Sequence, residues 1–472
     1  MRGQSSSAAT YFSMLELDES EADAERLYYL AECARRGDDR SEMLSLIERL
    51  SARYPNSPWR LKALISAGNA FLLDNEHEKF EPLYEAAHAN FAGQPEAAYP
   101  HWKLAWRSYL SRRRDAAERL RAHLIHYPSG SKASAALYFL GRMAESAQDF
   151  SSARAYYEKL LQQYPNFYHA VLARERLAER RLILAPAGPS KAAEFLTTVA
   201  FPERLLDSDS RPTPATLRRI ERARLLRSAG LAEWAESELR FGARHDGQPR
   251  LLALELAAAA SAPHQALRLM KSTAPNYLAA DLRRAPAEFW ERLFPLPYRE
   301  DILRSSRLAG LDPFMVAALI RQESEFNPQA VSRANARGLT QVMPSTGRQL
   351  ARRLKIRRFN NRLLFEPATN LRLGTLYLRG LLDEWGGRWE QALASYNAGA
   401  TRVEEWLGWG DFREPAEFVE TIPFTETREY VQSVIRNASI YRQLYSGTDL
   451  FAPAGGGSEA RAARQPGGKK GS

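Results

Sequence analysis

The stretch "ALYFLGRMAESAQDFSSARAYYEKLLQQYP", residues 136–165, decides the fold class of the first half of the chain. Its apolar residues recur at the spacing of two consecutive amphipathic helices. Gly141 and Ala153 are small and allow those helices to approach closely, and Pro165 ends the second helix because proline lacks the backbone N–H that a helix needs. The stretch therefore predicts a helical hairpin.

This hairpin is one of a series that repeats along the chain. Aromatic residues stand at positions 54, 91, 127 and 164, in "RYPNSP", "NFAGQP", "HYPSGS" and "QYPNFY", so they recur after 37, 36 and 37 residues. Such a period is typical of stacked helical hairpins, each of which buries its apolar face against its neighbours. The packing positions resemble those of a tetratricopeptide repeat and are Leu137, Leu140, Gly141, Ala153, Tyr157 and Pro165. We therefore predict a helical solenoid.

Changes in composition divide the 472 residues into more than one domain. The loop-forming segments "APAGPS" and "DSDSRPTPA" interrupt the repeats, helical periodicity then returns, and the character changes again from "FWERLFPLPYRE" onward. We see no strand pattern of any length, so the expected fold class is all-α. The expected divisions are a flexible N-terminus at 1–20, a helical-repeat domain at 21–288, a separate compact domain at 289–446 and a disordered tail at 447–472.

Charge and cysteine usage limit the possible partners and sites. Lys plus Arg exceed Asp plus Glu by 66 − 56 = 10, which favours a polyanionic partner such as nucleic acid, an anionic membrane surface or a cell-wall polymer, or simply gives a solvated basic surface. Cys33 is the only cysteine, so an intramolecular disulfide, a Cys-based zinc site and a CxxC redox pair are excluded.

The sequence gives little indication of where in the cell the protein is located. No apolar run approaches the roughly 20 residues of a membrane span. The segment "MRGQSSSAATYFSMLELDESEADAERL" lacks the apolar stretch of a signal peptide, so we expect a cytosolic protein or a mature form whose export signal was removed.

A carboxyl group lies at the end of a predicted buried helix in the second half of the chain. Asp312 reads as an N-cap, because a proline follows it at the first helical position. Val316, Leu319 and Ile320 then share one stripe with Glu323, at helical spacing. Partial burial at the edge of this stripe would raise the pKa of Glu323 and would make it a proton donor near neutral pH.

A purely structural role for Glu323 is also open. The carboxylate can form a buried ion pair with an arginine such as Arg321 or Arg337, and periodicity does not separate this role from that of a proton donor. Glu325 projects to another face of the helix, so we do not expect it to share the environment of Glu323.

Four motifs in this region occur together and in a fixed order. They are "ESEFNPQAVS" at 323–332, "GLTQVMPST" at 338–346, "SYNAG" at 395–399 and "ETIPFTETREYV" at 420–431. In this set the chain resembles the catalytic domain of the soluble lytic transglycosylases over roughly 290–446. That family has a lysozyme-like helical fold and cleaves bacterial peptidoglycan. The repeats before it are similar to the superhelical part of the large members.

The resemblance implies a role for each matching residue. Glu323 is the implied catalytic acid, and Ser332 contacts the N-acetyl region of the sugar. Gln341 donates and accepts hydrogen bonds towards the sugar, and Met343 adds adaptable apolar contact. Thr340 stands where the family usually has methionine.

The last two motifs supply the remaining implied substrate-binding residues. Tyr396 hydrogen-bonds near the acid or the developing charge, and Asn397 orients its loop. Glu420 and Tyr430 close the cleft. Simpler roles remain open, among them packing for Tyr396 or Met343 and a helix cap or an arginine pair for Glu420.

The resemblance also implies the reaction. Glu323 serves as acid and then as base, and a 1,6-anhydromuramoyl end forms without water, metal or cofactor. A goose-type lysozyme-like hydrolase and an inactive helical-repeat scaffold that binds peptidoglycan are the alternatives. The implied partner is the peptidoglycan glycan strand rather than nucleic acid, other cell-wall enzymes are open partners, and the implied location is the periplasm.

Overall fold

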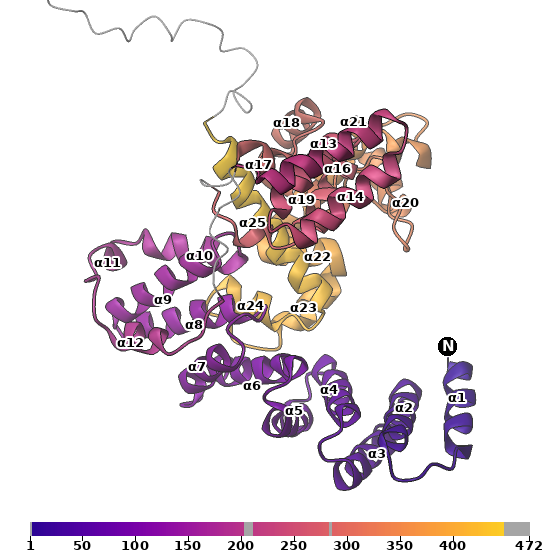
Figure 1. Ribbon diagram of the computed structural model, residues 1–472, viewed down its shortest axis with the longest axis vertical. Coiled ribbons are helices and arrows are strands. Elements are labelled where there is room, and N and C mark those ends of the chain that lie inside the picture. Colours follow the sequence, from indigo (N-terminus) through magenta and orange to yellow (C-terminus); the bar gives the residue numbers. More distant parts are fainter. Residues whose placement is uncertain (1, 203–210, 283–285, 448–472) are drawn as a thin grey trace, which may run out of the picture. The chain divides into compact units, whose positions relative to one another are not determined.

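The computed structural model describes residues 2–202, 211–282 and 286–447. These residues form α-helices and three short 3-10 segments, and among them no strand occurs, only isolated bridges at Val331–Arg337 and Arg337–Val342 (Figure 1). The predicted all-α class is confirmed. The predicted tail from 447 onward lies outside the described residues, except for Gly447.

The chain forms two compact units. One contains Met1–Arg211, Pro275–Ala285 and Leu381–Ser433, and the other contains Pro212–Ala274, Pro286–Gly380 and Val434–Ser472. This division does not follow the expected boundary at 288/289, because residues 381–433 of the 289–446 region group with the repeats. The linear boundary remains a prediction.

The first unit contains consecutive helical hairpins (Figure 1). Its helices are α1 (Arg2–Met14), α2 (Glu21–Gly37), α3 (Arg40–Arg53), α4 (Pro58–Leu73), α5 (His77–Phe91), α6 (Ala98–Leu110), α7 (Ala116–His126), α8 (Ala133–Ser146), α9 (Phe150–Gln163), α10 (Tyr168–Leu177), α11 (Arg180–Ile183) and α12 (Lys191–Thr197), followed later in the chain by α22 (Trp389–Ala398), α23 (Ala400–Leu407) and α24 (Pro415–Thr421), with 3-10 segments η1 (Pro95–Ala97) and η2 (Tyr277–Ala279).

The second unit contains the remaining elements. They are α13 (Pro214–Ser228), α14 (Ala232–His245), α15 (Pro249–Ala258), α16 (Pro263–Thr273), α17 (Ala287–Leu293), α18 (Arg299–Ala309), α19 (Pro313–Glu323), α20 (Pro344–Arg353) and η3 (Asn361–Phe365). The helices α21 (Pro367–Glu384) and α25 (Thr425–Tyr445) contribute residues to both units.

The repeated aromatic residues mark the joints between hairpins. Each ends or follows a second helix, with Tyr54 after α3, Phe91 at the end of α5, Tyr127 after α7 and Tyr164 after α9. The hydroxyl of Tyr127 donates to the carbonyl of Ala92 at 2.9 Å, and that of Tyr164 donates to the carbonyl of Pro128. Each tyrosine therefore reaches back one repeat, to the residue after the preceding aromatic.

Small residues lie where the helices of a hairpin meet, as predicted. A Cβ added at Gly141 would lie 2.4 Å from Cε1 of Tyr157, and one added at Gly68 would lie 2.2 Å from Cε1 of Tyr84. These contacts are far shorter than van der Waals contact, so both positions require glycine for close packing. The pairs α8–α9 and α4–α5 therefore use the same contact, two repeats apart.

The N-terminal residues differ from their prediction. Residues 1–20 were expected to be flexible, whereas Arg2–Met14 forms α1 and packs against α2. The ring of Phe12 stacks on that of Tyr29 with centroids 5.3 Å apart, and Arg26 donates to the carbonyl of Phe12 at 3.4 Å. Aromatic stacking of this kind adds to apolar burial and explains the ordering of α1.

Candidate active site

The helix α19 places Glu323 at its last position. Asp312 caps the helix, since its Oδ1 accepts a hydrogen bond of 2.9 Å from the backbone N–H two residues on. Val316, Leu319 and Ile320 are fully buried, and Glu323 is half-buried at the edge of their stripe. The predicted cap, helix and stripe are confirmed, whereas the chemical role of Glu323 stays a prediction.

A tight turn follows the helix and fixes the backbone beside Glu323. The Ser324 hydroxyl donates to the carbonyl of Leu339 at 2.8 Å, which ties the helix end to the "GLTQ" segment. Glu325 and Phe326 both have positive φ, 53° and 66°. Two consecutive non-glycine residues with positive φ make a sharp turn in the backbone. Such a conformation is uncommon and persists only when the surrounding structure stabilises it.

Glu325 is held by two cations from α16. Its carboxylate lies 2.7 Å from Nε of Arg268 and 2.7 Å from Nζ of Lys271. Burial alone would raise the pKa of Glu325, but the hydrogen bonds and charges of Lys271 and Arg268 outweigh burial and lower it. Glu325 is therefore an anion near neutral pH, which leaves Glu323 as the candidate proton donor of this motif.

Ser332 and Gln341 lie in the loop between α19 and α20. The Ser332 hydroxyl accepts from the backbone N–H of Ala336 at 3.0 Å. The Gln341 amide donates to the carbonyls of Gly338 at 2.8 Å and Ala330 at 3.2 Å. Both predicted substrate-binding side chains thus also shape their own loop, and each keeps an oxygen that can accept further hydrogen bonds.

Met343 precedes the first turn of α20 and is 39% exposed. The alternative of ordinary core packing for Met343 is therefore wrong. A flexible, polarisable side chain at this position is available for contact with a ligand.

Asn370 organises the "GLTQ" segment, and the sequence reading missed it. Its Oδ1 accepts from the backbone N–H and the hydroxyl of Thr340, at 2.8 and 2.7 Å, and its Nδ2 donates to the carbonyls of Arg337 and Leu364 at 2.9 and 2.8 Å. Gly338 packs against this amide with φ of 76°, and an added Cβ would lie 2.0 Å from the carbonyl oxygen of Leu364. Gly338 therefore needs both its positive φ and its lack of a side chain.

Thr340, which replaces the usual methionine of the family, is fully buried. Its hydroxyl donates a hydrogen bond to Oδ1 of Asn370. The same hydroxyl packs against Gly374, where an added Cβ would lie 2.2 Å from Oγ1 of Thr340. The difference from the family thus affects the core beneath the loop.

The remaining predicted residues belong to the other compact unit. Tyr396 and Asn397 lie in the last turn of α22, Tyr396 half-buried and Asn397 exposed. The Thr427 hydroxyl donates to Oδ1 of Asn397 at 2.7 Å, which connects the end of α22 to the start of α25. Tyr430 is buried, with 5% of its surface exposed.

The environment of Glu420 differs from the one that was predicted. Its carboxylate is fully buried and lies 2.7 and 3.1 Å from Nζ of Lys132, and it accepts from Nε2 of Gln432 at 2.6 Å. Burial alone would raise the pKa of Glu420, but the charges of Lys132, His169 and Arg428 lower it. A direct contact between Glu420 and substrate does not fit these contacts. The alternative of an arginine pair names the wrong partner, because the cation that forms an ion pair with Glu420 is Lys132.

In the described ranges, no group of three or more His, Cys, Asp or Glu side chains is arranged to hold a metal ion. No helix of those ranges is long and apolar enough to cross a membrane.

Parts of both halves of the chain match known protein families. Residues 302–418 match the Transglycosylase SLT domain, and residues 421–449 match the soluble lytic transglycosylase helical domain. Residues 27–57 and 135–166 match the tetratricopeptide repeat. The second of these repeat matches covers the hairpin of α8 and α9.

Individual proteins agree with these matches. The chain is 38% identical over 162 residues to the soluble lytic murein transglycosylase of Salmonella typhimurium and 36% identical over 160 residues to that of Escherichia coli K12, in each case over 33% of this chain. It spans a quarter of the length of these relatives, 25% in both cases.

A solved structure extends the likeness beyond the matched domain. An inactive mutant of the lytic transglycosylase Slt from Pseudomonas aeruginosa superposes with a TM-score of 0.64 at 25% identity, over 92% of this chain and 64% of the other. The ordered motifs, the domain matches and this superposition agree. Residues 302–449 therefore resemble the soluble lytic transglycosylases in sequence, and most of the chain is similar to one of them in fold.

Proposed function

We propose that this protein is a peptidoglycan lytic transglycosylase. It cleaves the β-1,4 bond between N-acetylmuramic acid and N-acetylglucosamine and leaves a 1,6-anhydromuramoyl end. The observation that carries the proposal is Glu323, a half-buried carboxyl at the end of the buried helix α19, inside the region that matches the Transglycosylase SLT domain.

In the proposed reaction one carboxyl acts twice. Protonated Glu323 gives its proton to the glycosidic oxygen, and the bond between that oxygen and C1 of the muramoyl sugar breaks. The developing positive charge at C1 is stabilised by the sugar's own acetamido group. The Glu323 carboxylate then removes the proton of the C6 hydroxyl, whose oxygen attacks C1. The proton count of the enzyme is unchanged, and no water is consumed.

The other predicted substrate-binding residues orient the sugar in this proposal. Ser332 and Gln341 hold the muramoyl ring through their free acceptor positions, and Met343 adds apolar contact. Tyr396 hydrogen-bonds near the developing charge, while Asn397 sets the position of its loop through Thr427. The buried Glu420 and Tyr430 support the segment that carries them rather than touching the glycan.

Two other outcomes are separated by the product. A goose-type lysozyme-like hydrolase would use water and give a reducing end, and an inactive scaffold would release nothing. Mass spectrometry of muropeptides after digestion of purified sacculi distinguishes the three cases. We expect products lighter by one water, about 18 Da, than their hydrolysed counterparts, because the C6 hydroxyl within the same sugar needs no recruitment of a second reactant.

The substrate sets the location and partner that we propose. Peptidoglycan glycan strands are the partner, and the location that we propose is the periplasm. Fractionation of the producing cells followed by immunoblotting checks the location, and recovery in the cytosol would contradict it.

A further inference from the structure

The helix α24 carries three carboxylates at every third position. Glu414, Glu417 and Glu420 follow one another within "EPAEFVE", so they share one side of the helix. Glu417 is 2% exposed and Glu420 is fully buried. Two of these carboxylates are removed from water and Glu414 is half-buried, and cationic partners offset the cost of such burial.

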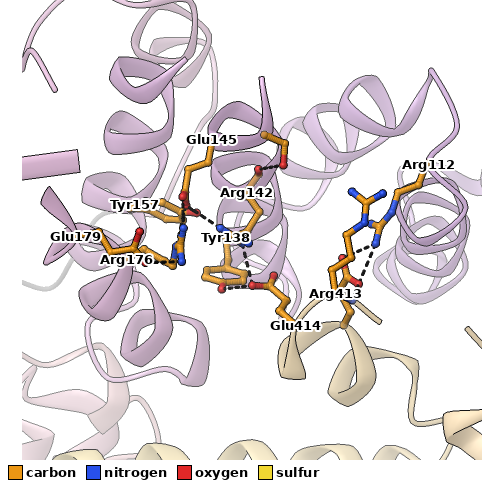
Figure 2. A network of polar contacts seen from close by, with 11 residues as sticks. Arg112, Tyr138, Arg142, Glu145, Tyr157, Arg176, Glu179, Arg413 and Glu414 are labelled. Atoms are coloured by element: carbon orange, nitrogen blue, oxygen red, sulfur yellow. Dashed lines mark hydrogen bonds and ion pairs between the residues drawn. The ribbon is translucent and has the colours of Figure 1, made fainter. Parts of the chain in front are cut away.

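Each carboxylate has its own cation in the repeats. Arg142 of α8 lies with Nε 2.9 Å from Glu414, and Lys132, just before α8, lies 2.7 Å from Glu420. Arg112, in the loop after α6, lies with Nη2 2.9 Å from Glu417. Figure 2 shows Arg142 and Arg112 pointing from the repeats towards the segment around Glu414.

Hydrogen bonds also connect the repeats with the α24 segment and fix its orientation. The Tyr138 hydroxyl donates to Glu414 at 3.1 Å (Figure 2), and the indole N–H of Trp106 donates to the Thr421 hydroxyl at 3.2 Å. Ala416 belongs to the same buried apolar cluster as Trp106. Side chains from Glu414 to Thr421 thus contact residues of α6, of α8 and of the loops beside them.

The end of α24 continues directly into predicted site residues. Arg428 donates to the carbonyl of Ile422 at 2.7 Å and so sets the turn from α24 into α25. One residue before it, Thr427 donates to Asn397 at 2.7 Å. A displacement of α24 therefore changes the position of Asn397, which belongs to the "SYNAG" motif beside Tyr396.

We propose that Arg112, Lys132 and Arg142 of the repeats are positioning residues for the reaction, which act through the acidic face of α24. This inference rests on the proposed transglycosylase function. The repeats then have a role in the chemistry itself, in addition to any role in binding the polymer.

The pair of Arg112 and Glu417 allows a charge-swap test in the full chain. We compare Arg112→Glu, Glu417→Arg and the double swap on short isolated glycan strands, at a temperature well below unfolding. We expect each single variant to lose at least about tenfold in kcat with little change in KM, because a displacement of about 1 Å can cost about a hundredfold in rate. The double swap should recover to within about threefold of the parent, since it restores opposite charges at the same place.

A matched control lies in the same loop. Arg113 pairs with Glu81 of α5 at 2.8 Å and takes no part in the contacts of α24. Arg113→Glu therefore makes the same charge change in the same loop, and we expect it to retain the kcat of the parent. If Arg112→Glu lowers only the melting temperature and leaves kcat unchanged, or if the double swap does not recover, the positioning role is wrong.

Hydrogen exchange separates this inference from the proposed function. We expect the amides of 415–421 to exchange faster in Arg112→Glu than in the parent, with protection restored in the double swap. An inactive parent with this exchange pattern would refute the transglycosylase proposal and retain the attachment of α24. Unchanged exchange in Arg112→Glu would refute the attachment itself. Arg112→Lys serves if the glutamate variant does not fold, and it should be intermediate in both measurements.

Discussion

At the scale of single residues, the two carboxyls of the "ESEF" segment stand in different surroundings. Glu325 is anchored by Arg268 and Lys271 and is ionised, whereas Glu323 ends the apolar stripe of α19. The surroundings of the two carboxyls therefore differ, and such a difference gives two carboxyls different parts in other sites.

Replacement of Glu323 by glutamine tests the acid role directly. The amide keeps the shape of the side chain but cannot donate the proton, so we expect Glu323→Gln to fold normally and to lose at least about a hundredfold in activity on sacculi. Glu325→Gln is the matched control and should retain more activity, because it removes two outer ion pairs rather than the acid. Equal activity of Glu323→Gln and the parent would exclude the acid role.

A group of histidines makes the first unit sensitive to acid. His88, His101, His123 and His126 gather on α5, α6 and α7, and Nδ1 of His101 lies 3.0 Å from Nδ1 of His123. Burial, with the nearby charge of His123, lowers the pKa of His101 to about 2. Burial, with the charge of Lys132, lowers that of His123 to about 3.

Stability should therefore fall as the pH falls. The pKa values of both histidines in the folded protein lie below the ordinary value of 6.5. At a pH between the folded-state values and 6.5, the unfolded chain therefore binds more protons than the folded protein. The stability is fully present above pH 6.5 and decreases by about 2 kcal/mol per histidine by pH 5. We expect the drop in melting temperature from pH 7 to pH 5 to be smaller in His101→Asn than in the parent. His245→Gln, at an exposed position, should match the parent, and an equal drop in all three proteins would contradict the assignment.

At the scale of elements, the close approach of α8 and α9 depends on one missing side chain. A Cβ at Gly141 would lie 2.4 Å from the ring of Tyr157, so that ring must shift in Gly141→Ala. We expect a loss of about 1–3 kcal/mol in the free energy of unfolding, as in other overpacked cores. Gly37→Ala is the control, because an added Cβ at the end of α2 meets nothing within 4 Å. Denaturant titration measures both variants, and equal stability would show that the hairpin repacks without cost.

Local pattern predicted these elements well, and it failed where distant segments meet. The period of the aromatics and the stripe ending at Glu323 depend on neighbours within a few turns, so the sequence reveals them. The pairing of Lys132 with Glu420 joins residues 288 apart. Three of the four bonds of Asn370 go to Thr340 and Arg337, which lie at least 30 residues away in the sequence. Neither has a periodic signature, so only the folded chain shows them.

At the scale of the whole molecule, the contacts between α24 and the repeats determine which fragments of the chain we expect to fold completely. The region 289–446 was expected to be a separate compact domain, yet α24 is seated on α6 and α8 through three ion pairs and an apolar cluster. A helix of seven residues has little stability alone.

Expression of 289–446 alone tests that dependence. We expect the fragment to keep α19 and to lose protection of the amides of 415–421 in hydrogen exchange, with a large loss of turnover on short glycan strands. The full chain under identical conditions is the reference. A fragment with the kcat of the full chain would show that the lysozyme-like part needs no support from the repeats.

The joints of the repeats have a consequence for how such an array evolves. The residue after each repeated aromatic has a carbonyl that accepts a hydrogen bond from a side chain. At two joints the donor is a tyrosine, Tyr127 to Ala92 and Tyr164 to Pro128. At the other two it is an arginine, Arg60 to Pro55 and Arg174 to Pro165. Donor and acceptor come from successive hairpins, so an insertion or deletion of part of a hairpin leaves a carbonyl without its donor. Gain or loss of one complete hairpin recreates the same joint between new neighbours. Complete hairpins can therefore be gained or lost on the N-terminal side of α6 without removing the cations that pair with the α24 segment.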